Sequence, residues 1–321
     1  MNQIKILEVR SEIGAGTRGA SLGPEAIHIA ALDFGTPFFK QFPPELIETE
    51  NQLLLEPAKN PFARRINGVL RTWEKVAASV KKVLDENDFP VVLAGDHSSA
   101  GGTIAGIKMA FPEQRIGVIW MDAHADIHSP YTTPSGNMHG MPLAASLNED
   151  NLANKVNNPD EKVVDRWNSL KNIGGIAPKI RYEDLVFVTM RDMEPQEELL
   201  INQHKVRNFT TDEINTLGTD KVAREMLSAL DGCEKIYISF DVDCMDSSIS
   251  KGTGTPMPNG ITEKQAANLI LRLMQSEKVC CFEIAEVNPT LDKENLMAEN
   301  AFEILQRVTN QLLINLSDED A

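Results

Sequence analysis

The pentapeptide Asp122-Ala123-His124-Ala125-Asp126 decides how the rest of this chain is interpreted. It directly follows Gly117–Met121, a short apolar run that predicts a buried strand. Residues two apart in an extended chain point to the same side, so Asp122, His124 and Asp126 are expected to project together where the strand ends. Two carboxylates and an imidazole in one place indicate the nucleus of a metal site. For the pentapeptide alone, a solvated loop is the alternative.

Apolar runs elsewhere predict that this strand belongs to a parallel sheet. They alternate with helical patterns, which is typical of a parallel sheet covered on both faces. We therefore expect an α/β protein, a three-layer α-β-α sandwich around a mostly parallel sheet. No linker-like break interrupts residues 1–321, so a single catalytic domain is expected. The predicted strands are Ile4–Val9, Pro90–Ala94, Gly117–Met121, Leu185–Met190, Ile236–Phe240 and Val279–Ala285, and the longer predicted helices are Ile66–Leu84, Pro195–His204, Thr219–Leu230, Ala266–Met274 and Leu296–Leu316.

The composition argues against several classes of protein. The net charge is −16, which disfavours nucleic-acid and anionic-membrane surfaces because these need patches of Lys and Arg. No apolar run approaches the length of a membrane span, and the first residues lack the form of a signal peptide. The cysteines at 233, 244, 280 and 281 form neither a zinc pattern nor a disulfide framework. We expect a reduced, cytoplasmic protein.

A glycine-rich segment near the N-terminus suggests a different function. Gly14-Ala15-Gly16-Thr17-Arg18-Gly19 matches the G-x-G-x-x-G pattern of dinucleotide-binding proteins. That fingerprint requires a helix to start within the motif, whereas here the first helical pattern starts only near Pro24. We interpret the segment as a loop at the edge of a pocket or a turn. Dinucleotide binding stays an alternative that a binding measurement on the purified protein would test.

Polar residues follow several of the predicted strands. His97, Asp241, Asp243 and Glu286 each come just after an apolar run, and the two Asp residues repeat the spacing of the pentapeptide. Ligands of parallel sheets bind outside the carboxyl ends of the strands, so we expect these side chains at one edge. Such a concentration of carboxylates and imidazoles predicts bound cations, and a set without thiolates favours hard ions such as Mn²⁺. The two His and four Asp of this set are too many ligands for one tetrahedral zinc ion but suit two ions that share carboxylates.

Six longer motifs resemble those of the arginase (ureohydrolase) family, in the order of that family and at similar spacings. They are Gly95–Ser98, Asp122–Asp126, Ser135–Gly140, Ser239–Asp243, Gly252–Pro256 and Glu286–Pro289. The loop from Thr17 to Pro24 also looks like the first loop of that family. The resemblance covers nearly the whole chain, from about Ile4 to the final helix, and the motifs are jointly very specific.

The resemblance implies a role for each residue of this set. The implied metal ligands are His97 and Asp126 for one Mn²⁺, His124 and Asp243 for the other, and Asp122 and Asp241 as bridges, with two ions per subunit. A hydroxide between the ions, held by Asp126, would attack the guanidinium carbon. Glu286 would pair with the guanidinium, and Thr255 would lie close to it. His139 would carry a proton to the leaving amine. A satisfied loop histidine is the alternative for His139.

The loop after the pentapeptide bears on the substrate. It looks like the arginase version, in which hydroxyl and amide groups bind the α-carboxylate, and this implies that role for Thr133, Ser135 and Asn137. Glu197 fits the second acidic contact to the α-amino group of the substrate.

Two positions depart from the usual arginase pattern. His128 stands where an arginase commonly has Asn in contact with the α-carboxylate, and Glu194 stands where Asp commonly meets the α-amino group. A neutral His can still donate one hydrogen bond, and a Glu, one methylene longer, can still accept one from an ammonium group.

The resemblance therefore implies manganese-dependent hydrolysis of L-arginine to L-ornithine and urea. One alternative is hydrolysis of another guanidino or formimino compound, namely a guanidino acid, agmatine or formiminoglutamate. Another is a non-catalytic family member that acts as a binding subunit, although lost ligands, its usual signature, are not seen. The resemblance also implies a homo-oligomer, a trimer or a hexamer, with a small-molecule guanidino substrate as its partner.

Overall fold

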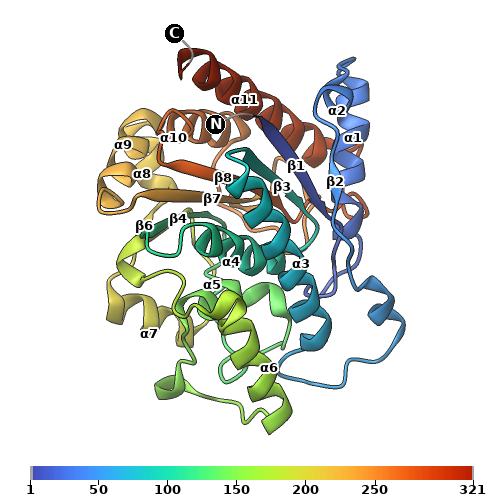
Figure 1. The fold of residues 1–321 in the computed structure, drawn as a ribbon, viewed down its shortest axis with the longest axis vertical. Helices are drawn as coiled ribbons and strands as arrows, with labels where there is room; N and C mark the ends of the chain where they lie inside the picture. The colour runs from blue at the N-terminus through green and yellow to red at the C-terminus, as the bar shows by residue number, and fades with distance from the viewer. Residues whose placement is uncertain (1–2, 320–321) are drawn as a thin grey trace.

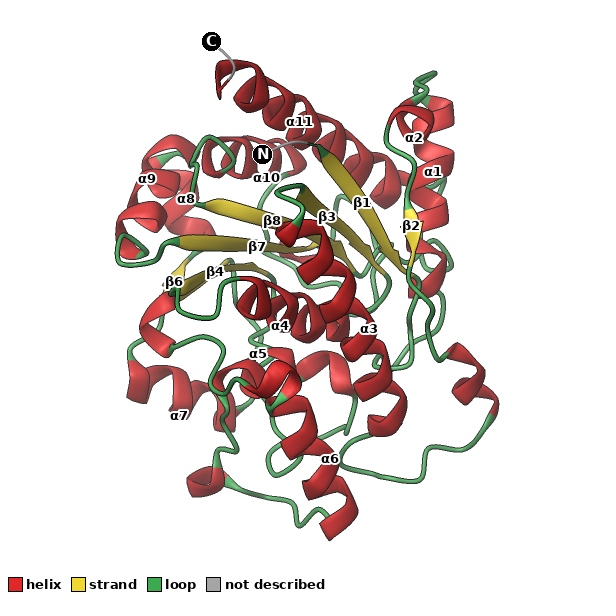
Figure 2. Cartoon of the chain, in the orientation of Figure 1, coloured by secondary structure: helices red, strands yellow, loops and turns green. Residues whose placement is uncertain are grey.

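The computed structural model describes residues 3–319. Its eight strands form one sheet in the order β2-β1-β3-β8-β7-β4-β5-β6 (Figures 1 and 2). Every neighbouring pair in that sheet is parallel, which confirms the α/β class and makes the sheet more uniform than predicted. The strands are β1 (Ile4–Val9), β2 (Glu45–Leu46), β3 (Phe89–Ala94), β4 (Ile116–Met121), β5 (Leu185–Val188), β6 (Arg207–Phe209), β7 (Lys235–Asp241) and β8 (Val279–Ala285).

Helices cover both faces of the sheet, as Figure 2 shows. Alternate residues of β4 divide between two cores, because Ile119 and Met121 face one helical layer while Val118 and Trp120 face the other. The strand is therefore buried on both sides, which explains its continuous apolar run. The first layer includes α1 (Gly23–Asp33), α9 (Thr219–Ala229), α10 (Glu263–Leu273) and α11 (Leu296–Glu319), and the second includes α3 (Ile66–Asp85), α4 (Ala100–Ala110), α5 (Pro142–Leu147) and α6 (Glu161–Lys171). The predicted three-layer sandwich is confirmed.

The predicted elements match the observed ones to within three residues at each end. The start of α10 shows how a local signal marks a helix boundary. Thr262 and Gln265 form the capping box that the sequence predicts, and the Gln265 N–H donates to Thr262 Oγ1 at 3.2 Å. The strands β2 and β6 are missing from the sequence prediction. They have two and three residues, too few for a measurable period.

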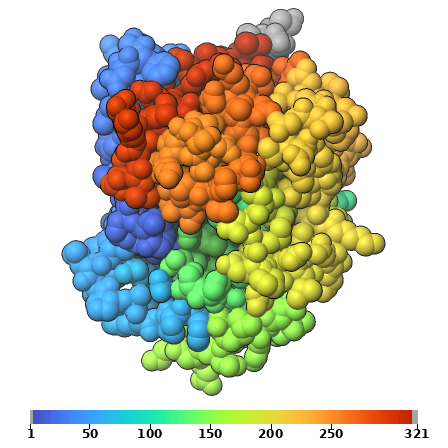
Figure 3. Space-filling model, turned by 180° about the vertical axis from the view of Figure 1, so that it is seen from behind, coloured from blue at the N-terminus to red at the C-terminus, as the bar shows by residue number. Residues whose placement is uncertain are grey.

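The sheet order brings the polar strand ends together. β3, β8, β7 and β4 are neighbours in the middle of the sheet, and they end at or just before His97, Glu286, Asp241 and Asp122, respectively. The ends of β4, β7 and β8 lie at nearly the same height in the sheet. Met121, the last residue of β4, lies opposite Phe240 on β7, and Asp241, the last residue of β7, lies opposite Ala285, the last residue of β8. Figure 3 shows segments from distant parts of the sequence, coloured from dark blue through green to orange, meeting on one face.

Three further expectations concern membrane-spanning helices, the cysteines and the glycine motif. No helix within residues 3–319 is both long and apolar enough to cross a membrane. All four cysteines are buried and free. The first α-helix begins at Gly23, beyond the motif that ends at Gly19. The helix start that dinucleotide binding requires is therefore not inside the motif.

Candidate active site

Three carboxylates surround one nitrogen of a buried histidine. His97 Nδ1 lies 2.9 Å from Asp122 Oδ2, 3.2 Å from Asp126 Oδ2 and 3.3 Å from Asp241 Oδ2. The other ring nitrogen, Nε2, lies 2.7 Å from Ser239 Oγ. If Nε2 donates its proton to this hydroxyl, Nδ1 carries a lone pair that faces three acidic oxygens. Within residues 3–319, no hydrogen bond satisfies this buried nitrogen, so the group has the chemistry of a cation site.

A second group shares one carboxylate with the first. His124 Nδ1 lies 3.0 Å from Asp243 Oδ2 and 3.3 Å from Asp122 Oδ1. Asp122 thus offers Oδ2 to the His97 group and Oδ1 to the His124 group, which is the geometry of a bridging carboxylate. All six residues predicted as metal ligands therefore lie together, in two groups that could each hold an ion.

The electrostatics of these groups favour bound cations. Burial, followed by the charge of Asp122, raises the pKa of Asp126 to about 6. Burial and the charges of Asp243 and Asp122 raise the pKa of Asp241 well above its usual range. Positive charge at the site would offset this repulsion between carboxylates. Carboxylates with imidazole and without thiolate suit hard divalent ions, so the residues present fit two such ions.

A histidine and a glutamate face each other beside these groups. His139 Nδ1 lies 3.2 Å from Glu286 Oε1. Glu286 is buried, has a left-handed φ of 65°, and accepts a hydrogen bond from the backbone N–H of His97 at 2.9 Å. Burial alone would lower the pKa of His139, but the hydrogen bond and charge of Glu286, with the charges of Asp126 and Asp96, raise it to about 9. The pair supplies a proton donor and an acidic partner for a cation.

A cavity of about 280 Å³ opens above the two groups. Its volume suits one amino-acid-sized ligand. Among the predicted site residues, its lining includes His124, Asp126, His128, Thr133, Ser135, Asn137, His139, Glu194, Glu197, Asp241 and Thr255. Thr255 also contacts the metal-ligand candidates, because its Oγ1 lies 3.2 Å from Asp243 Oδ2. The structure thus places nearly every predicted substrate-binding residue around one cavity.

One end of the cavity carries an acidic pair in contact with a histidine. His128 Nε2 lies 2.9 Å from Glu194 Oε2 and 3.4 Å from Glu197 Oε2, and its Nδ1 lies 3.0 Å from Thr132 Oγ1. The two glutamates form the capping box at the start of α7 (Pro195–His204). Burial and the neighbouring Glu194 raise the pKa of Glu197 well above its usual range. The two positions that depart from the arginase pattern therefore contact each other.

The loop along the cavity rim has fixed side chains. Thr133 Oγ1 accepts a hydrogen bond from the Gly136 N–H at 2.9 Å, and Ser135 Oγ accepts one from the Asn137 N–H at 3.1 Å. Asn137 Oδ1 accepts one from Arg64 Nη1 at 3.0 Å. Within the described part of the chain, no group accepts a hydrogen bond from the side-chain nitrogen of Asn137. This loop offers hydroxyl and amide groups to an anionic ligand group.

Sequence reasoning missed four polar residues that contact the site. These are Ser239, Thr132, Arg64 and Asp192, whose Oδ2 lies 3.7 Å from His124 Nε2. Ser239 lies within one of the motifs given above, two residues before Asp241, and that position on the same face of a strand could have identified it. Arg64 follows a segment with no clear period, and nothing in the sequence points to it.

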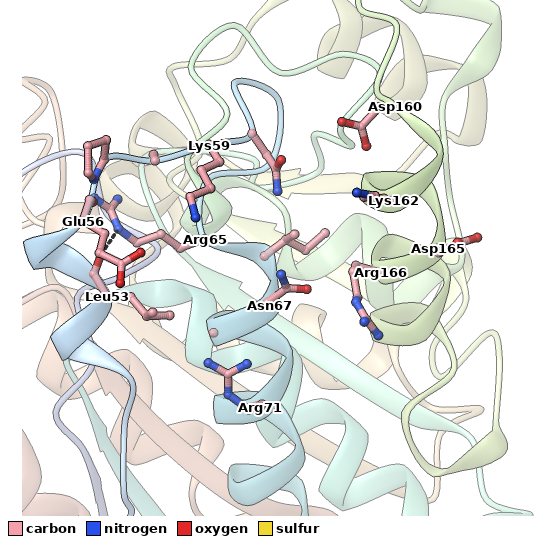
Figure 4. A pocket seen from close by; sticks show the side chains of 15 residues that line it. Leu53, Glu56, Lys59, Arg65, Asn67, Arg71, Asp160, Lys162, Asp165 and Arg166 are labelled. Carbon is pink, nitrogen blue, oxygen red and sulfur yellow. Dashed lines mark hydrogen bonds between the residues drawn. The ribbon is translucent and has the colours of Figure 1, made fainter.

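A separate cavity of about 790 Å³ lies beside α3 and α6 (Figure 4). Its lining includes Lys59, Arg65 and Arg71 on one side and Lys162 and Arg166 on α6. None of the predicted site residues lines it, so the predicted chemistry is confined to the smaller cavity.

The sequence and the fold were compared with those of known proteins. The sequence model of the Arginase family matches residues 2–310. An arginase of Bacillus subtilis (strain 168) is 34% identical, over 97% of this chain and 99% of its own length. The crystal structure of an arginase from Bacillus subtilis has a TM-score of 0.78 at 33% identity and covers 96% of this chain and 98% of that one. The arginase of Entamoeba histolytica, solved in complex with L-ornithine, has a TM-score of 0.81 at 25% identity over 96% and 97% of the two chains. This chain belongs to the arginase family of metal-dependent hydrolases.

Proposed function

We propose that this protein hydrolyses the guanidinium group of L-arginine to give L-ornithine and urea. One observation carries the proposal: a single cavity joins two groups of metal-ligand candidates to an acidic pair and a hydroxyl-amide loop. An α-amino acid carries an ammonium and a carboxylate, which match the acidic pair and the loop in charge and hydrogen bonding. The relatives named above as arginases support the same substrate.

The metal is proposed as two Mn²⁺ ions per subunit. His97 and Asp126 would hold one ion and His124 and Asp243 the other, with Asp122 and Asp241 between them. When bound, such ions lower the pKa of a water molecule and so supply a nucleophile at neutral pH. We expect Asp126→Ala and Asp241→Ala to abolish activity and to lower bound manganese. Unchanged metal content in both variants would contradict this ligand assignment.

The residues around the ions hold and protonate the substrate. Glu286 pairs with the guanidinium, which suits a buried carboxylate that faces a planar cation, and Thr255 lies beside that end. Asp126 holds the attacking water by a hydrogen bond. His139, which contacts Glu286, transfers a proton to the leaving amine. The contact with Glu286 raises the pKa of His139, which favours the protonated imidazolium that a general acid requires.

The far end of the cavity binds the α-amino and α-carboxylate groups of the substrate. Glu194 and Glu197 accept hydrogen bonds from the α-ammonium group, and Thr133, Ser135 and Asn137 donate to the α-carboxylate. His128 contacts both glutamates, so we assign it to the ammonium end of the substrate as well. A site built to pair both ionic groups rejects analogues that lack one of them.

We further propose that residues 1–321 form a single catalytic domain, that the protein works in the cytoplasm, and that it assembles as a trimer or hexamer. Four free, buried cysteines support a reducing compartment. The mass of the assembly in solution tests the oligomeric state.

A substrate panel tests the proposed function. The Mn²⁺-loaded enzyme is given L-arginine, agmatine, a shorter guanidino acid and formiminoglutamate, and urea and formamide are measured. We expect L-arginine to give urea with the highest kcat/KM. A higher kcat/KM for another member of the panel would replace arginine by that compound. No urea from arginine at full metal loading would refute the proposal, and the Asp241→Ala variant controls for contaminating activity.

A further inference from the structure

Arg64 lies outside every motif discussed above. It makes two contacts with residues 133–137, the loop that is proposed to bind the α-carboxylate and is called the substrate loop below. Its Nη1 donates a hydrogen bond to Asn137 Oδ1 at 3.0 Å. Its backbone N–H donates to the carbonyl oxygen of Gly136 at 2.8 Å. The side chain and the backbone of one residue therefore both hold the segment that is proposed to bind the α-carboxylate.

Close packing fixes the backbone of Arg64 relative to this loop, although the residue itself is exposed. Gly136 has a φ of 74°, and a Cβ there would lie only 1.9 Å from the carbonyl oxygen of Pro61. The following residue, Arg65, precedes the first residue of α3 and donates from Nε to the carbonyl oxygen of Leu53 at 3.1 Å. The backbone of Arg64 thus lies between a tight contact at Pro61 and the start of a 20-residue helix, which together limit its movement.

The contact selects which end of the Asn137 amide faces Arg64. An amide accepts through its oxygen and donates through its nitrogen, whereas a guanidinium can only donate. Arg64 therefore pairs with Oδ1, and within residues 3–319 no group accepts a hydrogen bond from Nδ2. Nδ2 lies beside Gly16, where a Cβ would come within 2.6 Å of it. Asn137 lines the cavity, so its free N–H groups can meet a ligand carboxylate there.

We propose that Arg64 is a positioning residue for carboxylate recognition: it holds Asn137 Oδ1 so that the N–H groups of that amide are presented to the α-carboxylate of the substrate. This inference rests on the proposed function of the loop. Hydrogen bonds from a charged donor are stronger than neutral ones, and a polarised amide is a better donor at its other end. Gly16, part of the glycine-rich segment, provides the space that the amide nitrogen occupies. The segment thereby serves the substrate loop rather than a nucleotide.

The first test compares ligands with and without a carboxylate. Agmatine keeps the guanidinium and the amine of arginine but lacks the carboxylate. In Arg64→Met we expect kcat/KM for arginine to fall about five- to tenfold, mainly through KM, because one charge-assisted hydrogen bond is lost. The kcat/KM for agmatine should stay unchanged. Inhibition constants for ornithine and putrescine give the same comparison without turnover. The matched control is Arg166→Met, an exposed arginine on α6 whose side chain has no hydrogen-bond or ion-pair partner within residues 3–319.

A double-mutant cycle then separates positioning from direct contact. If Arg64 acts through Asn137, Arg64→Met should cause no further loss in an Asn137→Ala background. Equal losses in both backgrounds would show that Arg64 itself binds the carboxylate, and equal losses for both substrates would show a merely structural role. Either result overturns the inference. An unaltered enzyme that gives no urea from arginine refutes the proposed function instead, so the two failures are distinguishable.

Discussion

Ser239 on β7 orients His97, which follows the end of β3, through a 2.7 Å contact between His97 Nε2 and Ser239 Oγ. Both side chains are buried. Ser239 lies on β7, two residues before Asp241, so one face of this strand supplies both a ligand candidate and the group that orients another ligand. The contact leaves His97 Nδ1 facing the carboxylates, which gives the first group the chemistry of a cation site.

Replacing Ser239 by Ala should weaken metal binding without unfolding the protein. Loss of a group that orients a metal-ligating histidine typically costs about 10- to 100-fold in metal affinity. We expect a loss of that size for Mn²⁺, measured by calorimetric titration of the metal-free protein. Ser146→Ala is the control, because Ser146 is also buried but donates to the Pro142 carbonyl, away from the metal-ligand candidates. Wild-type affinity in Ser239→Ala would contradict the orienting role.

His139→Ala should slow turnover while keeping both ions. Removal of a general acid typically reduces the rate by about 10² to 10⁴. We expect a loss in kcat of this size with manganese content unchanged, measured by steady-state kinetics and elemental analysis of the same preparation. A wild-type kcat would remove the proton-transfer role. Loss of manganese would show that His139 supports the metal site instead.

Removing the charge of Glu194 should raise KM mainly for substrates that carry an α-amino group. In Glu194→Gln we expect KM for L-arginine to rise about tenfold, because a charge-assisted hydrogen bond to the ammonium becomes neutral. The KM for 5-guanidinopentanoate, which lacks that amine, should change much less. Glu198→Gln, an exposed neighbour on α7, is the matched control. Equal effects on both substrates would place the ammonium elsewhere in the cavity.

A buried lysine gives the protein a measurable dependence of stability on pH. Lys179 donates from Nζ to the carbonyl oxygens of Lys171 and Ile176, and burial lowers its pKa from 10.5 to about 8. Between these values the unfolded chain binds more protons than the folded one, so this group makes stability rise with pH.

Lys179→Met removes that contribution. Relative to this variant, the free energy of unfolding of the wild-type protein should increase from pH 8 to pH 10.5, by up to about 3 kcal/mol at 1.36 kcal/mol per pKa unit. Urea unfolding at a series of pH values measures the difference, with Lys264→Met, an exposed lysine on α10, as the control. If the stability difference between the wild-type protein and Lys179→Met does not change from pH 8 to pH 10.5, the pKa of Lys179 is not lowered in the folded state.

The sequence was most informative where the chain is buried on both faces. Strands such as β4 are continuous apolar runs, and an ionisable residue directly after such a run, such as Asp122, stands out. The order of the strands in the sheet could not be predicted from such runs. His97 and Asp241 meet only because β8 lies between β3 and β7, and the apolar runs themselves do not encode that order. The likeness between the motifs and those of a known family supplied what the periodicity lacked.

Contacts between loops could not be predicted in the same way. The pairs His128–Glu194 and Arg64–Asn137 join residues 66 and 73 positions apart, on segments without a regular period. Their meeting depends on backbone packing, such as the contact of Gly136 with Pro61, which a sequence pattern does not show. For this reason the meeting of the metal-ligand candidates was easier to predict than the contacts among the proposed substrate-binding residues.

The most direct test of the account is the release of urea from L-arginine during titration of the metal-free enzyme with Mn²⁺. We expect no urea without metal and a rise to a plateau at about two equivalents per chain, as two groups of ligands require. Ornithine should form in equal amount. No urea from L-arginine at full metal loading would contradict the central claim.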